Sequence, residues 1–174
     1  MALMAGLRPD GSPADVFMQS LLSVALGLAA SASAKDPMLF FAGRTEGDGT
    51  MTVTMRKGYR SQTHGHGRIE ADGSLFLAQQ VEEEGKPPRQ RIWRIRRLAE
   101  GRYTGTMSEA EGPVAIEAID GRYRFRFGMK GGLSVEQWLI PIGDGSAVQS
   151  RLTARKFGIT VARGDGIIRK ISAP

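Results

Sequence analysis

The chain has 174 residues, of which 41% are hydrophobic and 24% are charged, a composition that fits one globular domain and excludes a disordered chain. Its formal net charge of +6 at pH 7 favours anionic partners, such as phospholipid headgroups, without identifying one. Cysteine is absent, which excludes disulfides, thiol catalysis, thiolate metal sites and attachment of lipid through a thioether.

The first predicted element is an uncharged segment, residues 16–34, that is rich in Leu, Ala and Ser. Its apolar centre is too short to span a bilayer, and small residues stand three and one positions before Lys35, as a signal peptidase requires. The segment predicts a secretory leader over residues 1–34 and an exported, periplasmic protein. Two acids near Arg8 make the front end unlike a usual leader. The alternative is an N-terminal helix that flanks or plugs the domain of a cytoplasmic protein.

Residues 35–174 are expected to form one domain of short strands, without a linker or a long repeat. Strands are predicted at residues 50–56, 62–70, 74–83, 89–98, 102–108, 113–119, 122–129, 133–142, 147–156 and 166–171. Residues 157–163 fit either a strand or a short helical turn. Pairs that end in Gly predict two-residue hairpin turns, because Gly tolerates the positive φ that such turns need. These pairs are Asp72-Gly73, Glu100-Gly101, Asp120-Gly121, Gly131-Gly132, Asp144-Gly145 and Asp165-Gly166.

Alternation with a period of two is clearest over residues 122–127, where arginines occupy one face of the strand and aromatic rings the other. No helical pattern after residue 35 is long enough to cover a sheet, so the strands are expected to hide their edges by closing on themselves. Tight turns between successive strands favour an all-β, antiparallel up-and-down β-barrel of about 8–10 strands over a sandwich, which needs longer connections.

Six short motifs resemble, in their order, the bacterial family called domain of unknown function 3833, over most of residues 40–171. They are Phe40-Phe41-Ala42-Gly43, Asp72-Gly73-Ser74-Leu75, Arg91-Ile92-Trp93, Gly101-Arg102-Tyr103-Thr104-Gly105, Glu136-Gln137-Trp138 and Lys156-Phe157-Gly158. The resemblance implies a lipocalin-like or calycin-like barrel in envelope proteins, many described as lipoproteins, with no established activity. Members often lie beside genes for fatty-acid modification, which favours a lipid ligand.

The chain departs from this family in two places. It has no cysteine for lipid attachment, so the lipoprotein description does not transfer. Where relatives tend to carry Asp near the fifth strand and before the tryptophan, it has Ser108-Glu109-Ala110 and Glu136-Gln137. An acidic role shared with those relatives is therefore not expected.

Large aromatic rings are the candidate ligand-binding residues, because small barrels either fill their interior with such side chains or hold one small ligand. The rings expected to line the interior are Trp93, Tyr103, Tyr123, Phe125, Phe127 and Trp138. Arginines are the candidate anion-binding residues, because their guanidinium groups bind phosphate and carboxylate with two hydrogen bonds. They are Arg91, Arg94, Arg122, Arg124 and Arg126. The alternative is a solvated outer face.

Catalytic and metal chemistry have weaker support. His64 and His66 share one face of a strand, but Arg68 follows on that face and no third ligand stands nearby, so no metal is expected. Glu109 and Glu111 flank a turn, where carboxylates are usually solvated. No nucleophile elbow, phosphate loop or dinucleotide fingerprint is present, so the sequence predicts no cofactor and identifies no catalytic residue.

Three hypotheses follow. The favoured one is an exported, non-catalytic lipocalin-like protein that binds or carries a fatty acid, phospholipid or similar amphiphile. The second is an enzyme that acts on an envelope lipid, with Glu109 or His64 as acid or base. The third is a structural envelope protein that contacts an anionic membrane surface through its basic wall. Nucleic acid is not expected as a partner, because aromatic residues that would stack on bases are few. The oligomeric state stays open.

Overall fold

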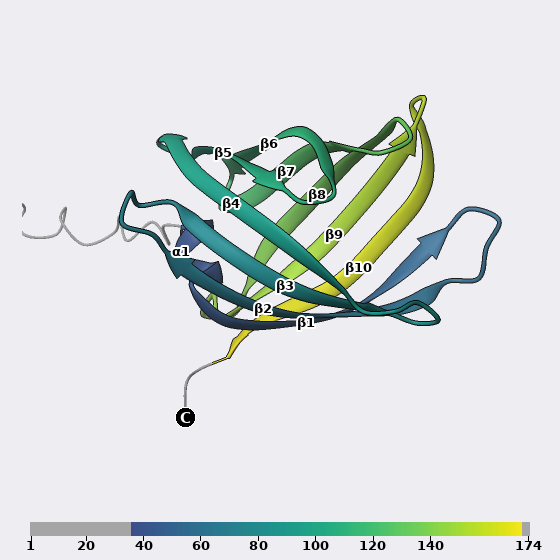
Figure 1. Ribbon diagram of the computed structural model, residues 1–174, viewed down its shortest axis with the longest axis horizontal. Coiled ribbons are helices and arrows are strands. Elements are labelled where there is room, and N and C mark those ends of the chain that lie inside the picture. Colours follow the sequence, from purple (N-terminus) through teal and green to yellow (C-terminus); the bar gives the residue numbers. More distant parts are fainter. Residues whose placement is uncertain (1–35, 172–174) are drawn as a thin grey trace, which may run out of the picture. The chain divides into compact units, whose positions relative to one another are not determined.

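The computed structural model describes residues 36–171, which form one antiparallel barrel with a short helix at one end (Figure 1). The elements in chain order are α1 (Pro37–Phe41), β1 (Gly43–Val53), β2 (Tyr59–Ile69), β3 (Leu75–Glu83), β4 (Arg89–Ala99), β5 (Arg102–Met107), β6 (Ala110–Ile119), β7 (Arg122–Met129), β8 (Leu133–Ile142), β9 (Ala147–Lys156) and β10 (Ile159–Ile171). The leader or helix predicted for residues 1–34 lies outside the described residues.

Closure follows from the pairing of the first and last strands. Each strand pairs with its neighbours along the chain, and β1 also pairs with β10, from Arg44 opposite Ile171 to Val53 opposite Ala162. A closed ring leaves no strand edge unpaired, which removes the need for a covering helix. The predicted all-β, antiparallel up-and-down barrel is confirmed, with ten strands in the described residues.

The two strands that close the ring are longer than the sequence predicted, and Asp165-Gly166 is not a turn. β1 begins at Gly43 and β10 at Ile159, so the ambiguous residues 157–163 are mostly strand. Gly166 lies opposite Gly49, and a Cβ atom at Gly166 would stand 2.6 Å from the backbone oxygen of Asp48. Glycine is therefore needed here because two backbones approach closely, a requirement that the sequence cannot distinguish from a turn.

The helix α1 covers one end of the barrel. Asp36 caps it by accepting a hydrogen bond from the N–H of Met38 at 2.9 Å, and Pro37 occupies the first turn, where its missing N–H is tolerated. Phe40 and Phe41 are buried and meet edge to face, with 5.0 Å between ring centroids. The described part of the chain contains no helix that is long and apolar enough to cross a membrane.

The turns divide between two ends of the barrel (Figure 1). The closed end lies beside α1 and holds the turns that join β2 to β3, β4 to β5, β6 to β7 and β8 to β9. The open end holds the turns that join β1 to β2, β3 to β4, β5 to β6, β7 to β8 and β9 to β10.

Candidate functional site

The barrel encloses a cavity of about 360 Å³, a volume within the range of small-molecule sites. The cavity extends from Phe41 at the closed end to Tyr59, Glu83 and Arg89, which adjoin turns of the open end. A second hollow of about 660 Å³ at the open end shares Glu83, Arg89 and Met129 with it. The cavity therefore reaches the surface at the open end.

The cavity is widened by glycines on one wall of the barrel. Four glycines line the cavity where β1 and β10 meet: Gly47, Gly49, Gly164 and Gly166. Beside these glycines, β2 places the small residues Ser61 and Thr63 at the cavity. Barrels of this size are filled when large side chains project from every wall, so a wall of glycine leaves space for a ligand.

The far wall holds packed aromatic rings. Trp93 meets Phe125 and Phe127 edge to face, with 6.2 and 6.0 Å between ring centroids. The Nε1 atom of Trp93 donates a hydrogen bond of 2.8 Å to Oε1 of Gln79, and both side chains are buried. Since a buried N–H without a partner would be destabilising, this bond holds the indole in one orientation.

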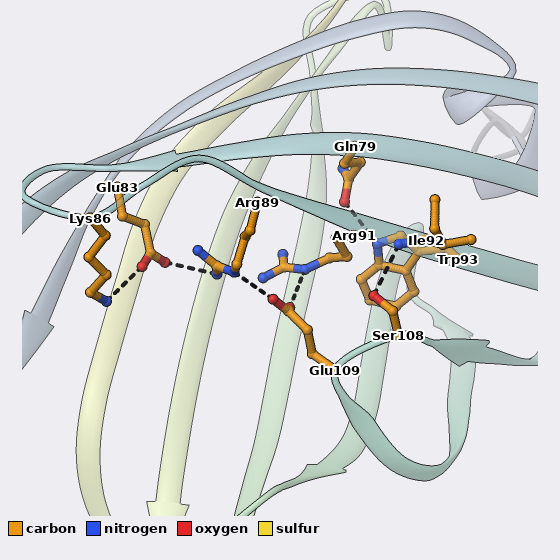
Figure 2. A network of polar contacts seen from close by, with 9 residues as sticks. All are labelled: Gln79, Glu83, Lys86, Arg89, Arg91, Ile92, Trp93, Ser108 and Glu109. Atoms are coloured by element: carbon orange, nitrogen blue, oxygen red, sulfur yellow. Dashed lines mark hydrogen bonds and ion pairs between the residues drawn. The ribbon is translucent and has the colours of Figure 1, made fainter.

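A chain of ion pairs crosses the open end of the cavity (Figure 2). Glu109, in the turn between β5 and β6, accepts hydrogen bonds from Nε of Arg89 at 2.5 Å and from Nε of Arg91 at 2.6 Å. Glu83 accepts from Nη2 of Arg89 at 3.1 Å and from Nζ of Lys86 at 2.7 Å. Three cations meet two carboxylates, so the cluster carries one positive charge in excess.

Both carboxylates in this cluster are held in their ionised form. Burial raises the pKa of Glu109, but the charges and hydrogen bonds of Arg91 and Arg89 outweigh it, and the pKa lies below its usual value. Burial likewise raises the pKa of Glu83, and Lys86 and Arg89 outweigh that effect. Glu109 is thus a poor proton donor near neutral pH, and both of its oxygens already accept hydrogen bonds.

Arg91 is the arginine of this cluster with the more unused hydrogen-bonding capacity at the cavity, because Arg89 already uses two of its nitrogens. Its side chain lines the cavity, and its bond to Glu109 uses Nε. Its two terminal nitrogens make no hydrogen bond or ion pair with any of residues 36–171, and in Figure 2 no dashed line joins them to another residue that is drawn. A guanidinium that is held by a carboxylate at Nε and unpaired at both terminal nitrogens presents a fork suited to a carboxylate or phosphate.

The structure brings together some of the predicted ligand-binding rings. Trp93 and Phe125 line the cavity, and Phe127 is buried against Trp93. Tyr103 and Tyr123 are buried in the core, and Tyr123 lies beside Phe40 and Phe41 of α1 at the closed end. Their role in binding stays a prediction.

Trp138 does not lie in the interior, which corrects the expected position. On β8 the neighbours Gln137 and Leu139 line the cavity, so the alternation of the strand directs Trp138 outward. The guanidinium groups of Arg122 and Arg124 cover its ring at 5.3 and 5.7 Å from the centroid.

The predicted arginines also divide between inside and outside. Arg91 lies at the cavity, whereas Arg94 lies on the outer face of the same strand, 4.9 Å from the ring centroid of Phe76. Arg122, Arg124 and Arg126 stand on the outer face of β7, opposite the buried rings. Glu117 accepts hydrogen bonds from Nη2 of Arg124 at 2.5 Å and of Arg126 at 3.3 Å, so part of this basic wall is neutralised.

The candidate acid–base and metal residues are apart from the cavity or already engaged. His64 is on the outer face of β2, 3.9 Å from a carboxylate oxygen of Glu46, while the inward neighbours Ser61 and Thr63 line the cavity. In the described ranges no group of three or more His, Asp or Glu side chains is placed to hold a metal ion.

Sequence reasoning missed several residues of the site: Gln79, Glu83, Arg89 and the glycines of β1 and β10. Two signals were present in the sequence. Arg89, Arg91 and Trp93 stand at every second position and therefore share a face, and β1 and β10 each carry Gly at alternate positions. Which face turns inward, however, depends on closure of the ring.

Comparison with known proteins bears on the family and the fold. The family described as "Protein of unknown function (DUF3833)" matches residues 24–170. No curated protein matches the sequence. Among solved structures, the barrel is similar to the S-type phycobiliprotein lyase CPES from Guillardia theta, with a TM-score of 0.64 and 6% sequence identity over 82% of this chain and 94% of that chain. At this identity the similarity establishes a lipocalin-like fold and carries no activity across.

Proposed function

We propose that this chain, which belongs to the family of proteins of unknown function called DUF3833, binds a small amphiphile with an anionic headgroup, such as a fatty acid or a lysophospholipid. The tail lies in the cavity between the glycine wall and the rings of Trp93 and Phe125, and the head meets Arg91 at the open end. The observation that carries the proposal is an apolar cavity whose open end contains an arginine with two unpaired terminal nitrogens.

The geometry favours binding over catalysis. A reaction by general acid–base chemistry needs a group that can exchange a proton at the substrate. Of the two candidates, His64 lies outside the cavity and Glu109 is held ionised between two arginines. The chain of ion pairs instead holds Arg91 in a fixed position. Less side-chain entropy is then lost when Arg91 binds an anion.

The test is uptake of a fluorescent fatty acid, cis-parinaric acid, by the purified protein and its displacement by palmitate. Arg91→Gln should weaken binding about tenfold or more, because a hydrogen bond to a charged group contributes ~1.5–3 kcal/mol. Arg94→Gln, on the outer face of the same strand, is the matched control and should bind like the wild type. The methyl ester of palmitate lacks the anionic head and should bind both variants equally.

Two outcomes would contradict the proposal. One is a wild-type protein that takes up no fatty acid and also yields no lipid on solvent extraction or by native mass spectrometry. The other is equal loss of affinity in Arg91→Gln and Arg94→Gln, which would remove Arg91 as the head-binding residue. Thermal melting of each variant shows whether the fold is intact.

We also propose that the protein is exported after removal of residues 1–34, on the basis of the uncharged, small-residue segment before Lys35. The intact mass of protein recovered from the periplasm of a bacterial host should correspond to a chain that begins at Lys35. A full-length chain confined to the cytoplasm would contradict export.

A further inference from the structure

The turns at the two ends of the barrel differ in the sign of their charge. The closed-end turns, residues 70–74, 100–101, 120–121 and 143–146, contain five acids and no Lys or Arg. The acids are Glu70, Asp72, Glu100, Asp120 and Asp144. The open-end turns contain Arg56, Lys57, Lys86 and Lys130, and Lys156 stands at the start of the last of them. Of the charged groups at the open end, Glu109 is already paired with Arg89 and Arg91, and Lys86 with Glu83. This leaves Arg56, Lys57, Lys130 and Lys156 against Glu84. The open end therefore carries a positive field.

The most exposed large apolar side chains among residues 36–171 also lie at the open end. Met55 is 99% exposed, Phe157 88% and Ile159 71%. Met55 lies in the turn between β1 and β2, Phe157 in the turn between β9 and β10, and Ile159 is the first residue of β10. Both turns lie at the end opposite α1 (Figure 1). Single exposed apolar residues are ordinary, but three of them on one charged rim indicate a contact surface.

The backbone at two of these residues gives an independent indication. Met55 has φ of 61° and Phe157 has φ of 51°, in the left-handed region that non-glycine residues avoid. Phe157 and Gly158 together form a two-residue hairpin loop with positive φ at both positions, where Asn-Gly is the favoured pair. A large ring at a turn tip that has a strained backbone and is 88% exposed contributes little to the packing of the fold.

We propose that the open end docks on an anionic lipid bilayer. Met55, Phe157 and Ile159 enter the interface, and Arg56, Lys57, Lys130 and Lys156 contact the headgroups. This set of seven residues is called the open-end rim. The inference goes beyond the proposed function, because docking requires no ligand in the cavity. It also directs the outlet of the cavity toward the membrane, as transfer of an amphiphile between the cavity and a bilayer requires.

The outer wall of β7 is the competing surface for such contact. Its arginines are partly neutralised by Glu117, and Arg122 and Arg124 lie over the ring of Trp138. No described residue of that wall is a large, strongly exposed apolar side chain. The open-end rim has both components of interfacial binding, whereas the wall has charge alone.

The first experiment measures flotation of the protein with vesicles of mixed phosphatidylglycerol and phosphatidylcholine, and with vesicles of phosphatidylcholine alone. The wild type should bind the anionic vesicles and should lose binding as salt rises. The variant Met55→Asn with Phe157→Asn should bind about tenfold more weakly or worse. Asn tolerates positive φ, so this variant should melt at the same temperature as the wild type or higher. Loss of binding would then not be a result of unfolding.

Two control variants separate the rim from other surfaces. Leu98→Asn removes an apolar side chain that is 57% exposed on β4, near the closed end, and should leave vesicle binding unchanged. Arg56→Glu with Lys57→Glu should reduce binding about tenfold or more, whereas Arg122→Glu with Arg126→Glu, an equal change of net charge on the outer wall, should have little effect.

The proposal is overturned if the wild type does not prefer anionic vesicles, or if the wall variant loses as much binding as the rim variant. A concentration-dependent dimer that Phe157→Asn dissociates, without vesicle binding, would overturn it as well and assign the rim to contact between copies. Uptake of cis-parinaric acid by the Met55→Asn with Phe157→Asn variant separates the two proposals. In this variant, normal uptake with lost docking supports the rim, and retained docking contradicts it. A wild-type protein that docks on anionic vesicles but takes up no cis-parinaric acid contradicts only the cavity.

Discussion

Gln79 and Trp93 are buried polar residues of the barrel interior that satisfy each other by a hydrogen bond. Both are buried, and Oε1 of Gln79 is the acceptor for the indole N–H, at 2.8 Å. A polar residue such as Gln79 is tolerated in an apolar cavity because it supplies the acceptor that the buried N–H of Trp93 requires. The orientation of Trp93, and with it the shape of the cavity, depends on that bond.

Gln79→Leu should lower the free energy of unfolding by about 1–3 kcal/mol, because it leaves a buried N–H without a partner. Urea denaturation monitored by tryptophan fluorescence measures the change. Gln80→Leu, at the exposed neighbouring position of β3, is the control and should change stability by less than about 0.5 kcal/mol. Equal effects of the two substitutions would contradict a structural role for the bond.

Tyr123 makes the stability of the barrel sensitive to alkaline pH. Burial, followed by the charges of neighbouring groups, raises its pKa from 10.0 to about 12. The unfolded chain therefore loses the phenolic proton at lower pH than the folded one. The stability that Tyr123 contributes is complete below pH 10.0 and is lost as pH rises to about 12, by up to about 3 kcal/mol.

The comparison with Tyr123→Phe isolates this effect. Between pH 10.0 and about 12 the free energy of unfolding should fall more steeply for the wild type than for Tyr123→Phe. Guanidinium unfolding at several pH values gives the two slopes. Absolute stabilities also differ because the substitution removes the hydroxyl group, so the slopes are the relevant quantity. Parallel slopes would show that Tyr123 does not titrate in this range.

At the scale of elements, the junction of β1 and β10 decides both closure and cavity. Glycines on the two strands let the backbones approach closely, and the same glycines leave space for the cavity along that wall. The sequence pattern of these strands is weak, because glycine contributes nothing to hydrophobic alternation. This is why β1 and β10 were predicted too short and Asp165-Gly166 was taken for a turn.

Two neighbouring glycines of β10 should respond differently to alanine. A Cβ at Gly166 would stand 2.6 Å from the backbone oxygen of Asp48, whereas a Cβ at Gly164 would stand 2.5 Å from the Sδ of Met51. The thioether can move but the carbonyl is held in the ladder. Gly166→Ala should therefore lose about 1–3 kcal/mol of stability and Gly164→Ala less. Thermal or urea unfolding tests the order, and the reverse order would contradict this account of closure.

At the scale of the whole molecule, the barrel is closed by α1 at one end and carries the outlet of its cavity at the other. The charges of the turns also differ between these two ends, with acids beside α1 and bases around the outlet. A ligand that binds the folded barrel and not the unfolded chain raises stability in proportion to the logarithm of its concentration. Melting therefore reports occupancy of the cavity.

Palmitate should raise the melting temperature of the wild type, by an amount equivalent to about 2.7 kcal/mol at a hundredfold excess over Kd. Ser61→Phe places a ring in the cavity at the glycine wall and should abolish this rise. Thr52→Phe, on the exposed face of β1, is the control and should retain it. An equal rise in all three proteins would mean that palmitate binds outside the cavity.

The sequence by itself determined the class of the fold and, for most strands, which residues share a face. Alternation is a local property of a strand, and glycine-containing pairs mark most of its turns, so the antiparallel barrel and the burial of Phe125 and Phe127 were predictable. Only the tertiary structure decided which residues share the cavity. Arg91 faces inward and Trp138 outward because ring closure sets which side of each strand is inside, and Glu109 reaches both arginines from a turn 18 or 20 residues away in sequence. Contacts of that separation depend on the register and curvature of the closed sheet, which no local pattern encodes.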